Sequence, residues 1–118
     1  MPLKPLTIRE EIAPGNGVVI FHLEGQLDTH SFEELNGCIQ SHFDESRFNL
    51  LFNLTGVDYI SSTCVGVFLS TLATATQNGG QVVIVNPVPK VQVVFDLFGL
   101  MQMFKVSTDL TSGLAQFP

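Results

Sequence analysis

The sequence predicts a small α/β domain built on a mixed, mostly parallel sheet of four to five strands with about four helices. Short apolar runs of strand length alternate with segments whose apolar residues recur at helical spacing. Turns rich in glycine, proline and asparagine separate them. The strand-helix-strand links have the length that right-handed crossovers between parallel strands require. With 118 residues, the chain is shorter than an average domain of roughly 150 residues, so we expect residues 1–118 to form one domain.

The chain is expected to open with an antiparallel hairpin. Residues 6–12 alternate weakly between apolar and polar, and residues 18–24 are rich in β-branched and apolar side chains. Between them lies the turn sequence Pro-Gly-Asn-Gly at residues 14–17. These two strands would form one edge of the sheet.

After Gly25 the apolar residues change to helical spacing, which predicts the first helix. The apolar stripe consists of Phe32, Leu35, Ile39 and Phe43. Ser31 and Glu34 have the spacing of a capping box, although Asp28 or Thr29 could equally begin the helix.

The middle of the chain is expected to supply two buried parallel strands with a helix between them. Residues 50–54 form a short apolar run bounded by Asn49 and Gly56, and residues 82–85 are fully apolar, as expected of strands that are buried on both faces. The helix between them ends at Gly79 and Gly80. Its apolar stripe consists of Val65, Phe68, Leu69, Leu72 and Ala75.

The last third is expected to contain a third helix, a short strand and a terminal helix. The third helix follows the break at Asn86 and Pro87 and is closed by Gly99. Its apolar residues are Val91, Val94, Phe95 and Phe98. Residues 103–106 form the candidate strand, and residues 107–109 offer N-caps for a helix that carries Leu110, Leu114 and Phe117.

Composition excludes several classes of function. Five Lys and Arg against 11 Asp and Glu give a net charge of -6, which disfavours direct binding to nucleic acid or to anionic membranes. No segment has the roughly 20 apolar residues of a membrane span, and the N-terminus does not resemble a signal peptide. We therefore expect a cytoplasmic protein without membrane insertion. Cys38 and Cys64 lie far apart without metal-ligand spacing, so neither a metal nor another cofactor is expected.

Candidate functional residues follow two strands of the predicted sheet, in the turns at residues 25–28 and 58–63. In parallel sheets, functional groups tend to lie beyond the carboxyl ends of the strands. Ser61, Ser62 and Thr63 place three hydroxyls at the start of a helix, where one can cap a free backbone N–H. One could instead accept a phosphate, which a helix N-terminus tolerates but which repels a neighbouring carboxylate such as Asp28 or Asp58.

These motifs resemble the STAS domain family, whose name joins sulfate transporters and bacterial anti-sigma factor antagonists. The resemblance spans about residues 6–114 and is closest to the stand-alone antagonists. It rests on Gly25-Gln26-Leu27-Asp28, on the run from Leu54 to Gly66, on Asn78-Gly79-Gly80, on Val85-Asn86-Pro87 and on Leu97-Phe98-Gly99-Leu100.

The resemblance implies a regulatory protein that is not an enzyme and has no catalytic residue. In such antagonists a partner anti-sigma factor, itself a serine kinase, phosphorylates a serine before the second helix, and a PP2C-type phosphatase removes the phosphate. The unphosphorylated form binds the kinase and frees the sigma factor, so that transcription in a bacterial cell is controlled. Ser62 aligns with the phosphoacceptor, with Thr63 and then Ser61 as second choices. The implied partner surface consists of Asp28, Asp58, Ser61, Ser62, Thr63 and Cys64.

Two residues depart from the family motif Asp-Ser-Ser/Thr-Gly-Leu-Gly. Ser61 replaces the aspartate, which removes a charge beside the acceptor, and Cys64 replaces the first glycine, where a side chain restricts close approach. The alternative function is therefore a STAS module that docks without being switched, for example as a transporter-associated subunit. The apolar residues 97–104 could form its partner surface, or they could be an ordinary helix end, turn and core strand, which we favour.

An enzymatic interpretation would use Cys64 as a nucleophile and His22, His30 or His42 as its base. No recognisable nucleophile motif surrounds the cysteine, and isolated histidines and cysteines are usually structural. We therefore predict that the chain is not an enzyme. The sequence predicts neither the partner's identity nor the oligomeric state.

Overall fold

The structure, a computed structural model, describes residues 5–97, 99 and 102–118. Its five strands form one sheet in the order β1-β2-β3-β4-β5. The strands are β1 (Thr7–Ile12), β2 (Val19–Leu27), β3 (Asn49–Ile60), β4 (Gln81–Val85) and β5 (Lys105–Ser107), and the helices are α1 (Thr29–Asp44), α2 (Ser62–Gln77), α3 (Pro89–Leu97) and α4 (Leu110–Leu114). Strand β1 is antiparallel to β2 and all other pairs are parallel, which confirms the predicted fold class.

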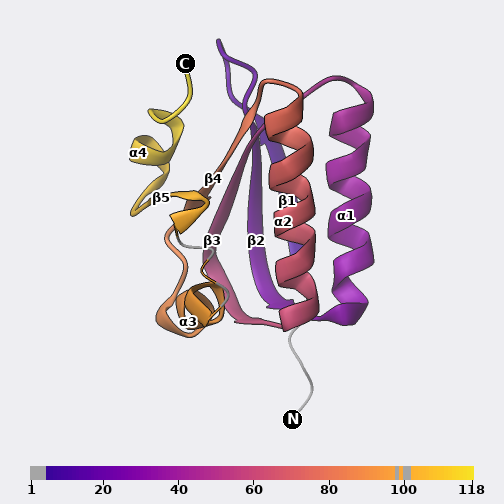
Figure 1. The fold of residues 1–118 in the computed structure, drawn as a ribbon, viewed down its shortest axis with the longest axis vertical. Helices are drawn as coiled ribbons and strands as arrows, with labels where there is room; N and C mark the ends of the chain where they lie inside the picture. The colour runs from indigo at the N-terminus through magenta and orange to yellow at the C-terminus, as the bar shows by residue number, and fades with distance from the viewer. Residues whose placement is uncertain (1–4, 98, 100–101) are drawn as a thin grey trace.

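Helices cover both faces of the sheet, and the strand residues alternate between two cores. Helices α1 and α2 lie side by side over one face, and α4 lies on the other (Figure 1). Val19, Phe21 and Leu23 of β2 point into the larger core, which also holds buried residues of α1, α2 and α3. Val18 and Ile20 point into the smaller core beneath the C-terminal segment. This two-sided burial explains why the first halves of the central strands are mostly apolar.

The predicted hairpin between β1 and β2 is confirmed. The backbone N–H of Ala13 donates to the oxygen of Val18 at 2.8 Å, and the turn contains Gly15 and Gly17 with φ values of +94° and +71°. Glycine adopts this left-handed region without steric cost.

Strands β2 and β3 extend further than the sequence predicts. Residues 25–27 and 58–60 of the two predicted turns, at residues 25–28 and 58–63, belong to these strands, because Gly25 pairs with Val57 and Leu27 pairs with Ile60. Asp58 therefore lies within β3 and not in a turn. The pairing continues past polar residues because Val57 and Ile60 are buried in the core beneath the helices.

Two helix boundaries also differ from expectation. Helix α1 is capped by Asp28, one of the starts left open, and its capping box joins Asp28 to Ser31; the predicted box of Ser31 with Glu34 is wrong. Helix α4 ends at Leu114, so Phe117 lies beyond it, although its side chain is buried in the smaller core.

The segment before β5 differs from expectation as well. Residue 103 lies in a turn, and the strand begins at Lys105 and ends at Ser107, one residue beyond the predicted 103–106. Of the apolar residues 97–104, Leu97 and Met103 are exposed and Phe104 is buried. Residues 98, 100 and 101 lie outside the described part of the chain.

Candidate partner-binding site

The two predicted functional segments lie next to each other at one end of the sheet. Helix α1 follows β2 and helix α2 follows β3, and these two strands are parallel neighbours, so that their carboxyl ends meet. The backbone N–H of Ser61 donates to the oxygen of Leu27 at 2.8 Å. The N-termini of α1 and α2 therefore form one continuous surface.

Asp28 is fixed at the first of these N-termini. Its Oδ1 accepts a hydrogen bond from the backbone N–H of Ser31 at 2.8 Å and one from the Ser31 hydroxyl at 3.0 Å. The hydrogen bond from the Ser31 backbone holds the pKa of the Asp28 carboxyl below its ordinary value. This site therefore carries a fixed negative charge at neutral pH.

Ser61 caps the second helix. Its side chain accepts from the backbone N–H of Cys64 at 3.4 Å, and its hydroxyl donates to Sγ of Cys64 at 3.3 Å. Ser61 is only partly exposed. The hydroxyl that stands at the family's aspartate position thus acts as an N-cap, a role that aspartate also performs.

Cys64 lies beneath this surface. Its side chain is 1% exposed, and its thiol donates to the backbone oxygen of Asp28 at 3.3 Å. Burial raises the pKa of the thiol. The expectation that Cys64 contacts a partner needs correction, because the residue instead supports the surface from inside by joining the two helix starts.

Ser62, Thr63 and Asp58 are the exposed members of the predicted set. Ser62 is the first residue of α2 and Thr63 is the second. Asp58 lies two residues before the end of β3. These side chains and Asp28 form the part of the predicted surface that a partner can reach.

His30 lies beside Asp28 at the start of α1, whereas the other two histidines occupy other parts of the molecule. His22 lies beside Asn53 and Glu11, and His42 lies beside Glu10 and Arg47. The hydrogen bonds of Cys64 in the described part of the chain go to Ser61 and Asp28. A buried thiol with a raised pKa also lacks the thiolate character of a nucleophile.

A hollow of about 400 Å³, which the sequence did not predict, lies beside Asp28. It is lined by Pro5, Leu6, Gln26, Asp28, His30, Ser31 and Glu34. Oε1 of Gln26 is buried and has no hydrogen-bond partner among the described residues. Gln26 and Glu34 flank Asp28 in the sequence, but only the folded chain brings residues 5 and 6 to the same place.

Two further properties concern the described residues only. No group of three or more His, Cys, Asp or Glu side chains there is arranged to hold a metal ion. None of the helices in that part of the chain has the length and apolar character needed to span a membrane.

Comparisons with known proteins agree with this fold. The family model of the STAS domain matches residues 10–113. The anti-sigma F factor antagonist of Lysinibacillus sphaericus is 29% identical over 83 residues, which are 70% of this chain and 71% of that protein. The anti-sigma-B factor antagonist of Staphylococcus epidermidis is also 29% identical over 83 residues, 70% of this chain and 77% of that protein.

The solved structure of the anti-sigma factor antagonist SpoIIAA in its unphosphorylated form has a TM-score of 0.81 at 21% identity and covers 93% of this chain and 95% of its own. This likeness shows a shared fold. Together with the family model, which covers most of the chain, it defines the class of protein. The chain belongs to the STAS domain family, and the curated relatives that it matches are anti-sigma factor antagonists.

Proposed function

We propose that the chain is an anti-sigma factor antagonist whose partner is an anti-sigma factor with serine-kinase activity. The unphosphorylated protein binds this partner, and phosphorylation of Ser62 ends the binding. A PP2C-type phosphatase restores the binding form. On this proposal the protein acts in the cytoplasm as a regulator of transcription and is not itself an enzyme.

The observation that carries the proposal is the different use of the three hydroxyls at the start of α2. Ser61 is occupied as the N-cap and as a hydrogen-bond donor to Cys64. Ser62 and Thr63 are exposed, and Ser62 is the position that aligns with the family's phosphoacceptor. This arrangement supports Ser62 over Ser61 as the modified residue.

A phosphate on Ser62 would change the surface without unfolding it. It adds about -1.5 to -2 charges at the N-terminus of a helix, where the helix dipole favours negative charge. The same phosphate lies on the surface that carries the Asp28 carboxylate, so it increases the local negative charge. A 100-fold loss of affinity for the partner requires only about 2.7 kcal/mol.

A second candidate function is a docking module that is never switched. The exposed apolar side chains of α3 favour this alternative, because Val93 and Leu97 are 56% and 76% exposed. Such side chains are common at protein-protein interfaces. The two functions differ in whether phosphate reaches Ser62.

The proposal is tested by mapping phosphate on the protein isolated from the cells that produce it. Tandem mass spectrometry of the peptide that contains residues 61–63 is expected to place a phosphate on Ser62, and the Ser62→Ala variant is expected to lose it. Phosphate on Thr63 alone, or none under any growth condition, would contradict the Ser62 switch and favour the docking module.

A further inference from the structure

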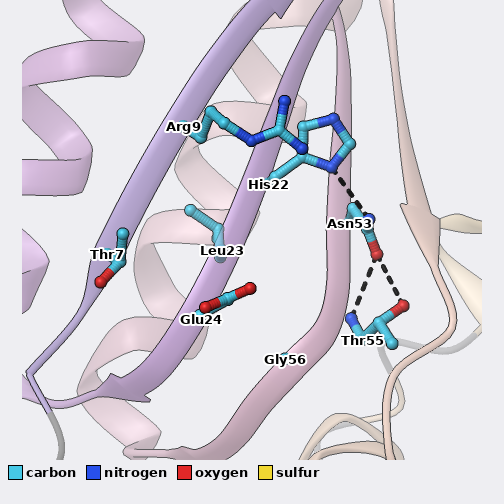
Figure 2. A pocket seen from close by; sticks show the side chains of 8 residues that line it. All are labelled: Thr7, Arg9, His22, Leu23, Glu24, Asn53, Thr55 and Gly56. Atoms are coloured by element: carbon cyan, nitrogen blue, oxygen red, sulfur yellow. Dashed lines mark hydrogen bonds between the residues drawn. The ribbon is translucent and has the colours of Figure 1, made fainter.

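The face of the sheet opposite α1 and α2 carries a second hollow, of about 500 Å³. Helix α4 contacts β3, β4 and β5 on that face and leaves much of β1 and β2 open. We call this hollow the polar groove. It is lined by Thr7, Arg9, His22, Leu23, Glu24, Asn53, Thr55 and Gly56 (Figure 2). Its volume lies in the range of roughly 300–1,000 Å³ that is typical of small-molecule sites.

An irregularity in the sheet shapes the groove. His22 pairs with Asn53 but Glu24 pairs with Gly56, so β3 contains one residue more than β2 between these pairs, which is a β-bulge. A Cβ on residue 56 would lie 2.7 Å from Cγ of Glu24 and 3.1 Å from the backbone oxygen of Leu23. Glycine at this position therefore leaves space for the Glu24 side chain to lie in the groove.

The floor of the groove is a hydrogen-bonded row of polar side chains. Oδ1 of Asn53 accepts from the backbone N–H and the hydroxyl of Thr55 at 3.2 and 2.7 Å. The amide nitrogen of Asn53 can then donate to Nδ1 of His22, which lies 3.0 Å away. These contacts fix the floor before any ligand arrives, so binding costs little ordering of side chains.

The walls of the groove carry opposite charges at separate places. Arg9 lies opposite His22 and Thr7 lies opposite Glu24, which makes Arg9 and Glu24 diagonal neighbours, with a backbone separation of roughly 7–8 Å. Arg9 extends over His22, whereas Glu24 lies beside Gly56 (Figure 2). The Arg9 side chain is 65% exposed and its guanidinium lies 3.5 Å from the carboxylate of Glu11, an exposed ion pair of the kind that contributes little energy and that a ligand can compete with. Glu24 forms no ion pair within the described part of the chain.

We propose that the polar groove binds a small zwitterion, namely a free amino acid. Its carboxylate pairs with the guanidinium of Arg9 and its ammonium group pairs with the carboxylate of Glu24. A simple anion would meet Arg9 but also the negative charges of Glu11 and Glu24, and a simple cation would meet Glu24 but also the positive charge of Arg9. A ligand that carries both charges pairs with Glu24 through its ammonium group and, because a guanidinium has five N–H donors, with the donors of Arg9 that Glu11 does not use. Ser62 begins a helix on the other face, so this inference does not depend on the proposed switch.

The proposal is tested by titrating the ¹⁵N-labelled protein with each of the free amino acids and recording amide chemical shifts. Sodium acetate and methylammonium chloride, added separately and together, supply the two charges on unconnected molecules. At least one amino acid is expected to give saturable shifts centred on the residues of the polar groove. Equal binding of acetate or methylammonium alone, or no saturable shift with any amino acid, would overturn the proposal.

Substitutions measure separately what the charges of Arg9 and Glu24 contribute to binding. Arg9→Gln and Glu24→Gln are each expected to weaken amino-acid binding about tenfold, the loss of a free-energy contribution of about 1.4 kcal/mol. Both side chains lie at the surface, and the amide spectrum reports whether each variant is folded. The matched controls Arg47→Gln and Glu33→Gln change the same charges outside the groove and are expected to leave the affinity unchanged. If only the Arg9 variant loses affinity, the groove is an anion site and the zwitterion proposal is wrong.

Discussion

The Sγ atom of Cys64 lies 3.3 Å from the backbone oxygen of Asp28, and the two residues are 36 positions apart in the sequence. This hydrogen bond joins the first turn of α2 to the residue that caps α1. With the bond from Ser61 to Leu27, it holds the two halves of the candidate partner surface in a fixed relationship. Cys64 occupies the position where the family motif has glycine, so this link distinguishes the chain from the motif that it resembles.

Cys64→Gly tests this link. The variant loses a buried thiol and its hydrogen bonds and gains the flexibility of glycine inside a helix, and we expect the free energy of unfolding to fall by about 1–3 kcal/mol. Urea denaturation at neutral pH measures this change. Cys64→Ala, which removes the thiol but keeps the helix propensity, should lose less. Equal stability of all three proteins would show that the link contributes nothing.

Ser61→Ala tests the cap of α2. Removal of an N-cap hydroxyl typically costs about 1 kcal/mol, and here it also removes the donor to Sγ of Cys64. Ser61→Asp restores a capping group and is expected to recover most of the loss in a denaturation experiment. A Ser61→Asp protein as unstable as Ser61→Ala would contradict the capping role.

Stability at acidic pH should depend on Asp28 and Asp109, which cap α1 and α4. Backbone hydrogen bonds from Ser31 and Ser112 hold the pKa values of these carboxyls below their ordinary value of 3.8. A carboxyl with a lowered pKa in the folded state stabilises the fold above its unfolded pKa, and this contribution is lost as the pH falls through the folded pKa. The urea concentration at the midpoint of unfolding should therefore decrease as the pH is lowered below about 4. Asp28→Asn combined with Asp109→Asn should flatten this decline, and an unchanged pH profile would contradict the assignment.

Gly113 tests the packing of α4 on the sheet. A Cβ at this position would lie 2.6 Å from Cγ2 of Val85 and 3.1 Å from Cδ1 of Leu51. We expect Gly113→Ala to destabilise the protein by about 1–3 kcal/mol, as overpacking usually does. The matched control is Gly37→Ala in α1, where a Cβ meets nothing within 4 Å; it should stabilise the protein by about 0.5–1 kcal/mol. Two variants that behave alike would show that α4 is loosely packed.

The fold was largely predictable because its signals are local. Residues 82–85 are all apolar, and residues 50–54 are apolar except for Asn53, because both faces of these strands are buried along most of their length. The helical stripe through Leu35, Ile39 and Phe43 is buried as its spacing predicts. The far ends of β2 and β3 were not predictable, because each is held by pairing with a distant strand and not by its own composition.

The candidate site was predictable only in part. The hydroxyls at residues 61–63 and Asp28 were found from their place after strands and from the family resemblance. The separate roles of these residues as helix cap, buried support or exposed side chain were not predictable, because the contact between Cys64 and Asp28 exists only in the folded chain. The polar groove depends on the β-bulge near Leu23, which leaves no clear pattern in the sequence.

Capture of partners from a lysate of the source cells tests the central claim most directly. The baits are the wild-type protein, Ser62→Asp, and Ser70→Asp as a control that adds the same charge at another exposed position of α2. Bound proteins are identified by mass spectrometry. We predict that an anti-sigma factor of the serine-kinase type is retained by the wild type and by Ser70→Asp and is lost with Ser62→Asp. The same partners on all three baits would contradict the switch at Ser62.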